Sequence, residues 1–220
     1  MATYMIHACE DRIWYVEKYL IPSMLEQGIK EEQILKWYDL EHRGNLYAFA
    51  DSMKVCGERA EEGIWHLQDD VIISKRFKEL TEEHDYEIVA GICMREVSDT
   101  ILYGRVDKQH IWYSFQCIRI PNRVAQGFAE WFFSFGCKTT QYKKYVDENK
   151  YDDLMFWIYL QDFCKWEKTV FNHNPNLVDH IDWLIGGSIV NTDRTRPLRA
   201  HFFDDDMELI EKLKQDLKSS

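Results

Sequence analysis

The first hundred residues alternate short apolar runs with amphipathic segments, and this alternation limits the fold more than any other feature. Apolar runs typical of buried strands cover 3–8, 34–38, 64–67 and 86–92. Segments with apolar residues at helical spacing lie between the first three runs. Strands that alternate with helices are typical of βαβ units. We therefore expect an α/β fold in which helices flank a mainly parallel, twisted sheet.

The second half of the chain has a different pattern. A long apolar strand is expected over 111–120, followed by strongly aromatic helices over 124–135 and 152–166. A charged amphipathic stretch at 204–220 predicts a C-terminal helix. No linker rich in Pro, Gly and Ser divides the sequence, so we expect a single domain.

Composition excludes several classes of protein. The chain carries 38 acidic and 27 basic residues, for a net charge of -11, whereas proteins that bind duplex DNA usually show a basic face. Nucleic acid is therefore disfavoured as a partner. The six cysteines form no C-x-x-C pair, which gives no zinc or redox motif. With no signal peptide and no apolar run of membrane-spanning length, a cytoplasmic protein is expected.

The strongest local feature is an apolar strand that ends in Gln68, Asp69 and Asp70, after which apolar residues resume. Two adjacent carboxylates at the end of a buried strand repel each other and lose solvation. A hard divalent cation such as Mg²⁺ or Mn²⁺ relieves that cost, because it prefers oxygen ligands. Asp39 follows another predicted strand, at the edge where parallel sheets bind ligands. The other interpretation is a polar turn whose acids cap a helix beginning near Ser74.

This acidic segment resembles the metal motif of glycosyltransferases with the A-type (GT-A) fold. The resemblance implies that Asp70 binds the metal that bridges the donor diphosphate. It also implies that Asp69 and Gln68 lie at the donor, although many relatives carry an acid at the position of Gln68. The opening strand matches the first strand of these enzymes, whose end, here His7 and Ala8, lies beside the nucleotide.

Two later segments extend the resemblance. Asp39 and the following Asn45 match the second strand and its nucleotide-contacting acid. Residues 175–180 are similar to a Pro-x-Leu-Val-x-His stretch whose His supplies a metal ligand or a diphosphate contact. The resemblance thus implies that His180 joins Asp70 at a Mn²⁺ or Mg²⁺ ion. Considered alone, a single His is more often a surface or capping residue.

The resemblance also suggests a base and a segment that covers the donor. In inverting enzymes of this fold, an acid in the region of Asp152 and Asp153 removes the proton of the acceptor hydroxyl. We favour Asp153, since one of the pair is equally suited to cap the following helix. If neither acid reaches the acceptor, a retaining mechanism remains open. Ser188 and Arg196 lie in a stretch similar to the mobile segment over the donor, or in a solvated loop.

The resemblance implies a metal-dependent transferase that moves a sugar from a nucleotide-diphosphate donor, with a UDP-sugar as first choice, to an unidentified acceptor hydroxyl. Its domain would cover 1–203, with a nucleotide-binding half over 1–100 and an acceptor half over 101–203, before the helix at 204–220. One alternative is a nucleotidyltransferase, which is disfavoured because 7–10 contain no glycine for a phosphate loop. Another alternative is a non-catalytic interaction module with the same fold.

Overall fold

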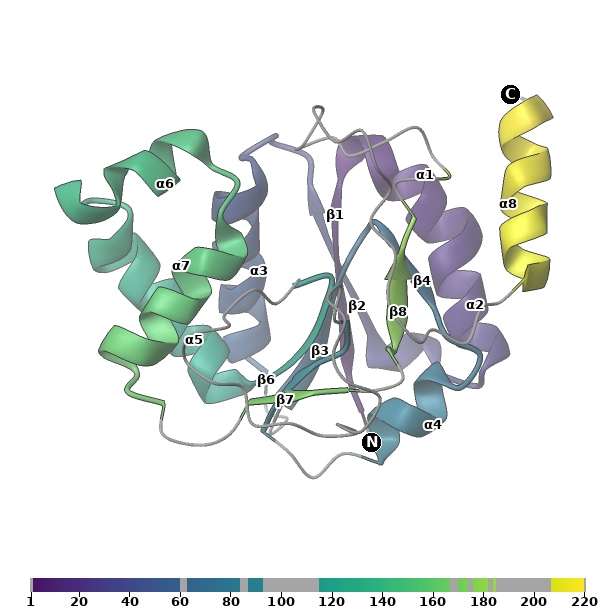
Figure 1. The fold of residues 1–220 in the computed structure, drawn as a ribbon, viewed down its shortest axis with the longest axis horizontal. Coiled ribbons are helices and arrows are strands. Elements are labelled where there is room, and N and C mark those ends of the chain that lie inside the picture. The colour runs from purple at the N-terminus through teal and green to yellow at the C-terminus, as the bar shows by residue number, and fades with distance from the viewer. Residues whose placement is uncertain are drawn as a thin grey trace.

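A mixed β-sheet runs through the middle of the molecule, between two groups of helices (Figure 1). The computed structural model describes residues 2–59, 63–83, 87–92, 115–166, 170–173, 176–181, 184 and 207–219. The strands within these ranges are β1 (Tyr4–Cys9), β2 (Ile34–Asp39), β3 (Gly63–Gln68), β4 (Val71–Ile73), β5 (Ile88–Ala90), β6 (Cys117–Pro121), β7 (Val170–Asn172) and β8 (Val178–His180). The α-helices are α1 (Ile13–Tyr15), α2 (Ile21–Glu26), α3 (Asn45–Gly57), α4 (Phe77–Glu82), α5 (Asn122–Trp131), α6 (Lys143–Glu148), α7 (Asp152–Ile158) and α8 (Met207–Ser219).

The expected α/β architecture is confirmed, but the sheet is mixed rather than mainly parallel. The described strands of the main sheet are ordered β2–β1–β3–β6–β5–β7. Strand β1 pairs in parallel with β2 and β3, and β5 pairs in parallel with β7. Strand β6 runs antiparallel to both β3 and β5. Apolar patterning identified the strands but not which strands pair, so it did not predict this reversal.

Alternation along β1 separates two cores. Tyr4, Ile6 and Ala8 pack in one core with α1, α2, β4, β8 and α8, whereas Met5 faces the other core with α3, α5 and α7. Successive side chains of a strand point to opposite faces, so one buried strand supplies both cores. The C-terminal helix α8 buries Ile210 and Leu213 in the first core, so it packs against the rest of the fold.

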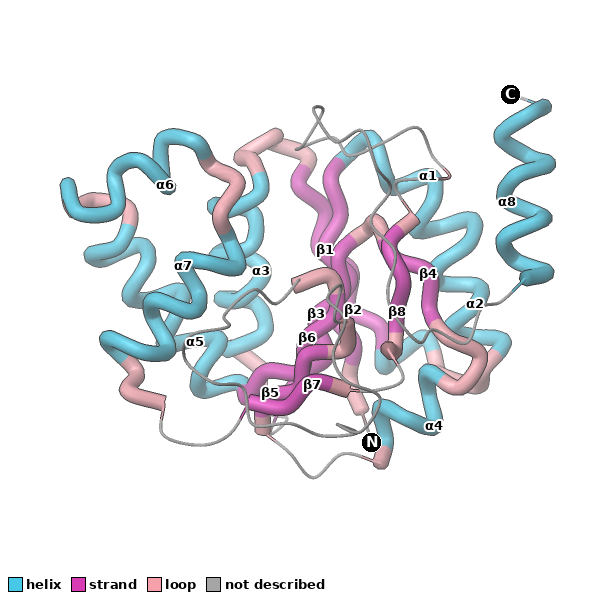
Figure 2. The backbone as a smooth tube through the Cα atoms, in the orientation of Figure 1, coloured by secondary structure: helices cyan, strands magenta, loops and turns pink. Residues whose placement is uncertain are grey.

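The structure refines the other expected elements. Helix α5 continues into a π-helical turn at Phe132–Gly136, and α7 continues into another at Tyr159–Phe163 (Figure 2). The strand expected over 111–120 begins only at Cys117, and residues 111–114 lie outside the described residues. Strand β5 is shorter than expected. The segment after Asp70 forms β4, which pairs antiparallel with β8, and helix α4 begins later than Ser74, at Phe77.

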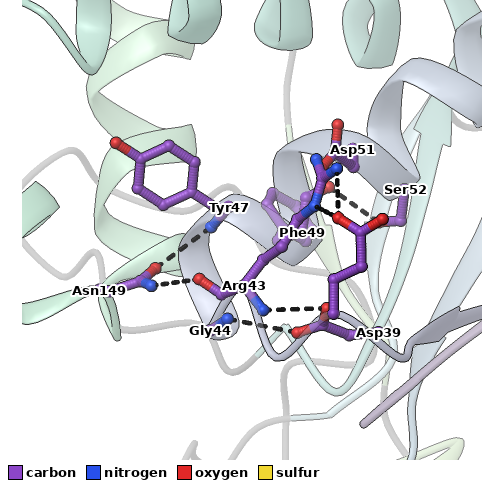
Figure 3. Close-up of polar contacts among 9 residues, drawn as sticks. Asp39, Arg43, Gly44, Tyr47, Phe49, Asp51, Ser52 and Asn149 are labelled. Carbon is purple, nitrogen blue, oxygen red and sulfur yellow. Dashed lines mark hydrogen bonds and ion pairs between the residues drawn. The ribbon is translucent and has the colours of Figure 1, made fainter.

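Helix α3 is capped by a residue far away in the sequence (Figure 3). Its N-cap residue is Gly44, which has a φ of 83° and no side chain to accept the first N–H groups. Asn149 takes that role: its Oδ1 accepts from the backbone N–H of Leu46 at 3.1 Å and of Tyr47 at 3.2 Å. Its Nδ2 donates to the carbonyl of Arg43 at 2.5 Å. A Cβ at Gly44 would lie 2.1 Å from that Nδ2, so glycine is needed here.

We expect Asn149→Ala to destabilise the protein. The lost cap costs about 1 kcal/mol of unfolding free energy, and alanine at the left-handed φ of 49° costs about 1 kcal/mol more. Asn149→Gly removes the cap but accepts this φ, so it should lose only about 1 kcal/mol. Urea unfolding of the three proteins measures both steps. Equal stability of Asn149→Ala and the wild type would show that the distant cap contributes nothing.

Candidate functional site

The candidate site lies where the strand order of the sheet reverses. The chain passes from β1 to β2 on one side, whereas β3 pairs with β1 on the other side. Ligands of open α/β sheets bind outside the carboxyl ends of strands at such a switch point. Here the backbone N–H of Cys9, at the end of β1, donates to Asp69 Oδ2 at 2.7 Å. A hydrogen bond therefore joins the two strand ends across the switch point.

Pairing of β4 with β8 brings Asp70 and His180 together. In the register of this pair Val71 lies opposite His180. The Asp70 carbonyl accepts from the N–H of Ile181 at 2.9 Å, which continues the ladder into the acidic turn. His180 Nε2 lies 3.2 Å from Asp70 Oδ2. Two residues that the sequence resemblance places at one metal ion are thus direct neighbours.

The surroundings of Asp70 fit a divalent cation. Within the described part of the chain, Asp70 Oδ1 is buried and has no hydrogen-bond partner, an arrangement that costs free energy unless a ligand supplies one. The Asp70 side chain as a whole is 17% exposed, so an ion can reach it. Two adjacent ligands of an octahedral ion, each about 2.1 Å from it, lie about 3 Å apart, close to the Asp70–His180 separation.

The described ranges offer only part of a coordination shell. They contain no group of three or more His, Cys, Asp or Glu side chains placed to hold an ion. A cation bound by Asp70 and His180 would take its other ligands from water and a bound anion. Mg²⁺ commonly binds in this way, through one or two carboxylates plus substrate phosphates.

Arg12 is a buried cation that sequence reasoning missed. It lies in the 3-10 turn that follows β1 and is 5% exposed. Burial and the charge of Asp70 raise the pKa of Asp69 to about 7, while Arg12 and the hydrogen bond from Cys9 act in the opposite direction. The charged run at 10–12, directly after the first strand, was the available signal, because a buried Arg requires acids beside it.

A tyrosine next to Arg12 completes this side of the site. Tyr15 is buried, and its hydroxyl donates to the carbonyl of Val71 at 2.7 Å, immediately after the acidic turn. Burial, followed by the charge of Asp70, raises the Tyr15 pKa. Its neutral hydroxyl therefore anchors the first residue of β4 from the side of α1.

Three predicted site residues form a second cluster. Asn45 Nδ2 donates to Asp152 Oδ1 at 2.8 Å, and Gln68 Nε2 donates to Asp152 Oδ2 at 2.8 Å. Both carboxylate oxygens thus accept an amide N–H, from α3 on one side and from the end of β3 on the other. This geometry favours a glutamine at position 68, because its amide supplies the N–H that Asp152 accepts and an ionised acid there could not donate.

The two acids at the start of α7 have different environments. Asp152 is 5% exposed, and burial followed by the charge of Asp153 raises its pKa to about 8. Asp153 is half-buried, and its Oδ1 accepts from the backbone N–H of Leu154 at 2.7 Å. Of the two, Asp153 is the one whose side chain reaches the surface.

His7 and Ala8, two further donor residues of the sequence prediction, are both buried. Ala8 is fully buried in the core, so only its backbone can meet a ligand. His7 is 6% exposed and packs edge-on against Trp37 with ring centroids 5.2 Å apart. Burial lowers the His7 pKa to about 4, so its imidazole is neutral.

The Asp39 carboxylate is also occupied by hydrogen bonds within the protein. Its carboxylate accepts from the backbone N–H groups of Arg43 at 3.0 Å and Gly44 at 3.2 Å (Figure 3). It therefore shapes the turn that leads into α3. Ser188 and Arg196, expected over the donor, lie outside the described residues.

Comparison with known proteins supplies no family. No protein-family model matches the chain, and no curated protein matches it. Among the residues that the structure describes, no helix has both the length and the apolar character needed to cross a bilayer. The functional argument therefore rests on the geometry of the site.

The buried Asp152 predicts a pH dependence of stability. Its pKa rises from an ordinary 3.8 to about 8 in the folded chain, so over this window the folded state holds a proton that the unfolded state has lost. The resulting stabilisation is complete below about pH 4 and is lost as the pH rises to about 8. The melting temperature of the metal-free protein should fall over this range, and Asp152→Asn should flatten the fall. Asp147→Asn, at an exposed acid of α6, is the matched control, and an unchanged slope in Asp152→Asn would contradict the assignment.

Proposed function

We propose that this protein is a metal-dependent glycosyltransferase that transfers a sugar from a nucleotide-diphosphate donor to an acceptor hydroxyl. The observation that carries the proposal is the contact of 3.2 Å between Asp70 Oδ2 and His180 Nε2 at the switch point of the sheet. An acid in the turn after a central strand and a distant His meet there, as the sequence resemblance to GT-A enzymes implies. The strand order β2–β1–β3, all parallel, supports a GT-A-like nucleotide-binding half.

Asp70 and His180 would hold the cation, either Mn²⁺ or Mg²⁺. Carboxylate oxygen and neutral imidazole together suit Mn²⁺ in particular. When bound, the ion supplies electrostatic stabilisation of the diphosphate that leaves the sugar. Asp69 is held away from this role, because its Oδ2 already accepts from the N–H of Cys9. Arg12 supplies a fixed positive charge beside the acids.

Asp153 is the base in this proposal, with inversion at the anomeric carbon. A general base must reach the acceptor hydroxyl and accept its proton. Asp152 is buried with both oxygens engaged by amides, whereas the Asp153 side chain is half-exposed on the same helical turn. The acceptor would approach from the α7 side of the sheet edge, opposite the core that contains β4 and β8.

A thermal-shift panel tests the donor site. We expect a nucleoside diphosphate, UDP first, to raise the melting temperature only when Mn²⁺ is present, because each ligand completes the binding site of the other. Asp70→Asn should abolish this joint shift. Asp11→Asn, the same change at an exposed acid near the site, should retain it. A rise in melting temperature that is the same with and without Mn²⁺ would favour a different nucleotide-binding activity. No rise with any nucleotide would favour the non-catalytic interaction module.

Turnover tests the base. Asp153→Asn should lower the rate of UDP release from a UDP-sugar by about 10²–10⁴-fold, since a positioned general base contributes that much. Its metal-dependent shift with UDP should stay that of the wild type, because in this proposal Asp153 serves the acceptor and Asp70 and His180 hold the metal. Release of UDP into water avoids the need to identify the acceptor. A wild-type rate in Asp153→Asn would assign the base elsewhere and reopen the retaining mechanism.

A further inference from the structure

The cluster of Asn45, Gln68 and Asp152 connects the proposed metal turn to the helices on the other side of the sheet edge. Asp152 bonds Gln68 across 84 positions of the sequence and Asn45 across 107 positions. Gln68 is the last residue of β3, and the turn at Asp69 and Asp70 follows it at once. The contact with Asp152 therefore holds the chain one residue before the turn.

Contacts from several elements hold the turn and the residues beside it, in addition to the bond from Tyr15 to the Val71 carbonyl. From β1, the N–H of Cys9 binds Asp69 Oδ2 at 2.7 Å. From β8, the N–H of Ile181 binds the Asp70 carbonyl at 2.9 Å. From α7, Asp152 holds Gln68. The first two contacts come from the strands of the donor side, so Asp152 provides the contact from the acceptor side.

A buried carboxylate at this place costs free energy that a purely structural contact would not require. Asp152 is 5% exposed, and the charges of Asp153 and Asp70 both act on it unfavourably. A neutral amide would avoid this repulsion but would offer one acceptor oxygen to two N–H donors. Buried polar groups that violate stability rules are concentrated at functional sites.

We propose that Asp152 is a positioning residue, which through Gln68 fixes the turn that carries Asp70 and thereby sets the metal affinity of the site. This inference rests on the proposed function, because it assumes that Asp70 binds the cation. It separates the two acids of α7: Asp152 points inward and sets the geometry of the metal turn, while Asp153 serves the acceptor. The same helical turn then fixes the distance between base and metal site.

Titration of Mn²⁺, followed by the electron paramagnetic resonance signal of the free ion, tests the inference without an activity assay. Asp152→Ala and Gln68→Ala should each weaken Mn²⁺ binding by about tenfold, the lower end of the effect of losing a group bonded directly to a metal ligand, because they act through the backbone beside Asp70. Asp152→Asn keeps the side-chain size and one acceptor oxygen. Its Mn²⁺ affinity should lie between that of the two alanine variants and that of the wild type. Melting temperatures of the metal-free variants show that each is folded.

Two matched controls separate positioning from simple destabilisation and from loss of charge. Asn45→Ala removes a bond of the same length to the same carboxylate, so it should lower the melting temperature like Gln68→Ala yet keep the Mn²⁺ affinity. Asp153→Asn removes the charge next to Asp152 and should also leave the Mn²⁺ affinity unchanged.

The outcomes distinguish this inference from the proposed function. Wild-type Mn²⁺ affinity in Gln68→Ala and Asp152→Ala would overturn the positioning role alone. Loss of affinity in Gln68→Ala but not in Asp152→Ala would assign the effect to Gln68 itself and overturn the role of Asp152. Failure of the wild-type protein to bind Mn²⁺ at all would overturn the metal site, and the positioning role with it.

Discussion

The candidate site depends on one short antiparallel pairing, between β4 and β8. Each strand has three residues, and their register sets Val71 opposite His180. Because Val71 follows Asp70 directly, this register decides which side chain from the C-terminal half faces the acid. A shift of one residue would turn His180 to the other face of the small sheet. Both strands are buried in the first core, which specifies the register through packing.

Charge burial is the second constraint on this edge of the sheet. The charge of Asp70 acts unfavourably on both Asp69 and Asp152. Arg12 offsets part of the charge of Asp69, and amide donors surround Asp152. Asp70 retains a buried oxygen without a partner in the described part of the chain. An edge that concentrates acids and leaves one of them incompletely satisfied is typical of a site completed by a ligand.

Local patterns predicted the elements of the first half well, because β1, β2 and β3 coincide with apolar runs and α3 carries apolar residues at helical spacing. They also singled out Asp70 and His180 as a pair, through motif resemblance rather than periodicity. Patterns did not predict β4, whose three apolar residues are too few to distinguish a strand from a turn. The reversed direction of β6, the distant cap supplied by Asn149 and the burial of Arg12 arise from tertiary contacts. A single sequence carries no signal for such contacts.

The central claim is that Asp70 and His180 bind one cation together with the diphosphate of the donor. Pulsed electron paramagnetic resonance of Mn²⁺ in the presence of UDP measures the nuclei bound to the ion directly. We predict a ¹⁴N coupling from imidazole together with ³¹P couplings from the diphosphate, and we predict that His180→Ala removes the ¹⁴N coupling alone. A spectrum with neither coupling, unchanged by His180→Ala, would contradict the claim, and the contact of Asp70 with His180 would then be a purely structural one.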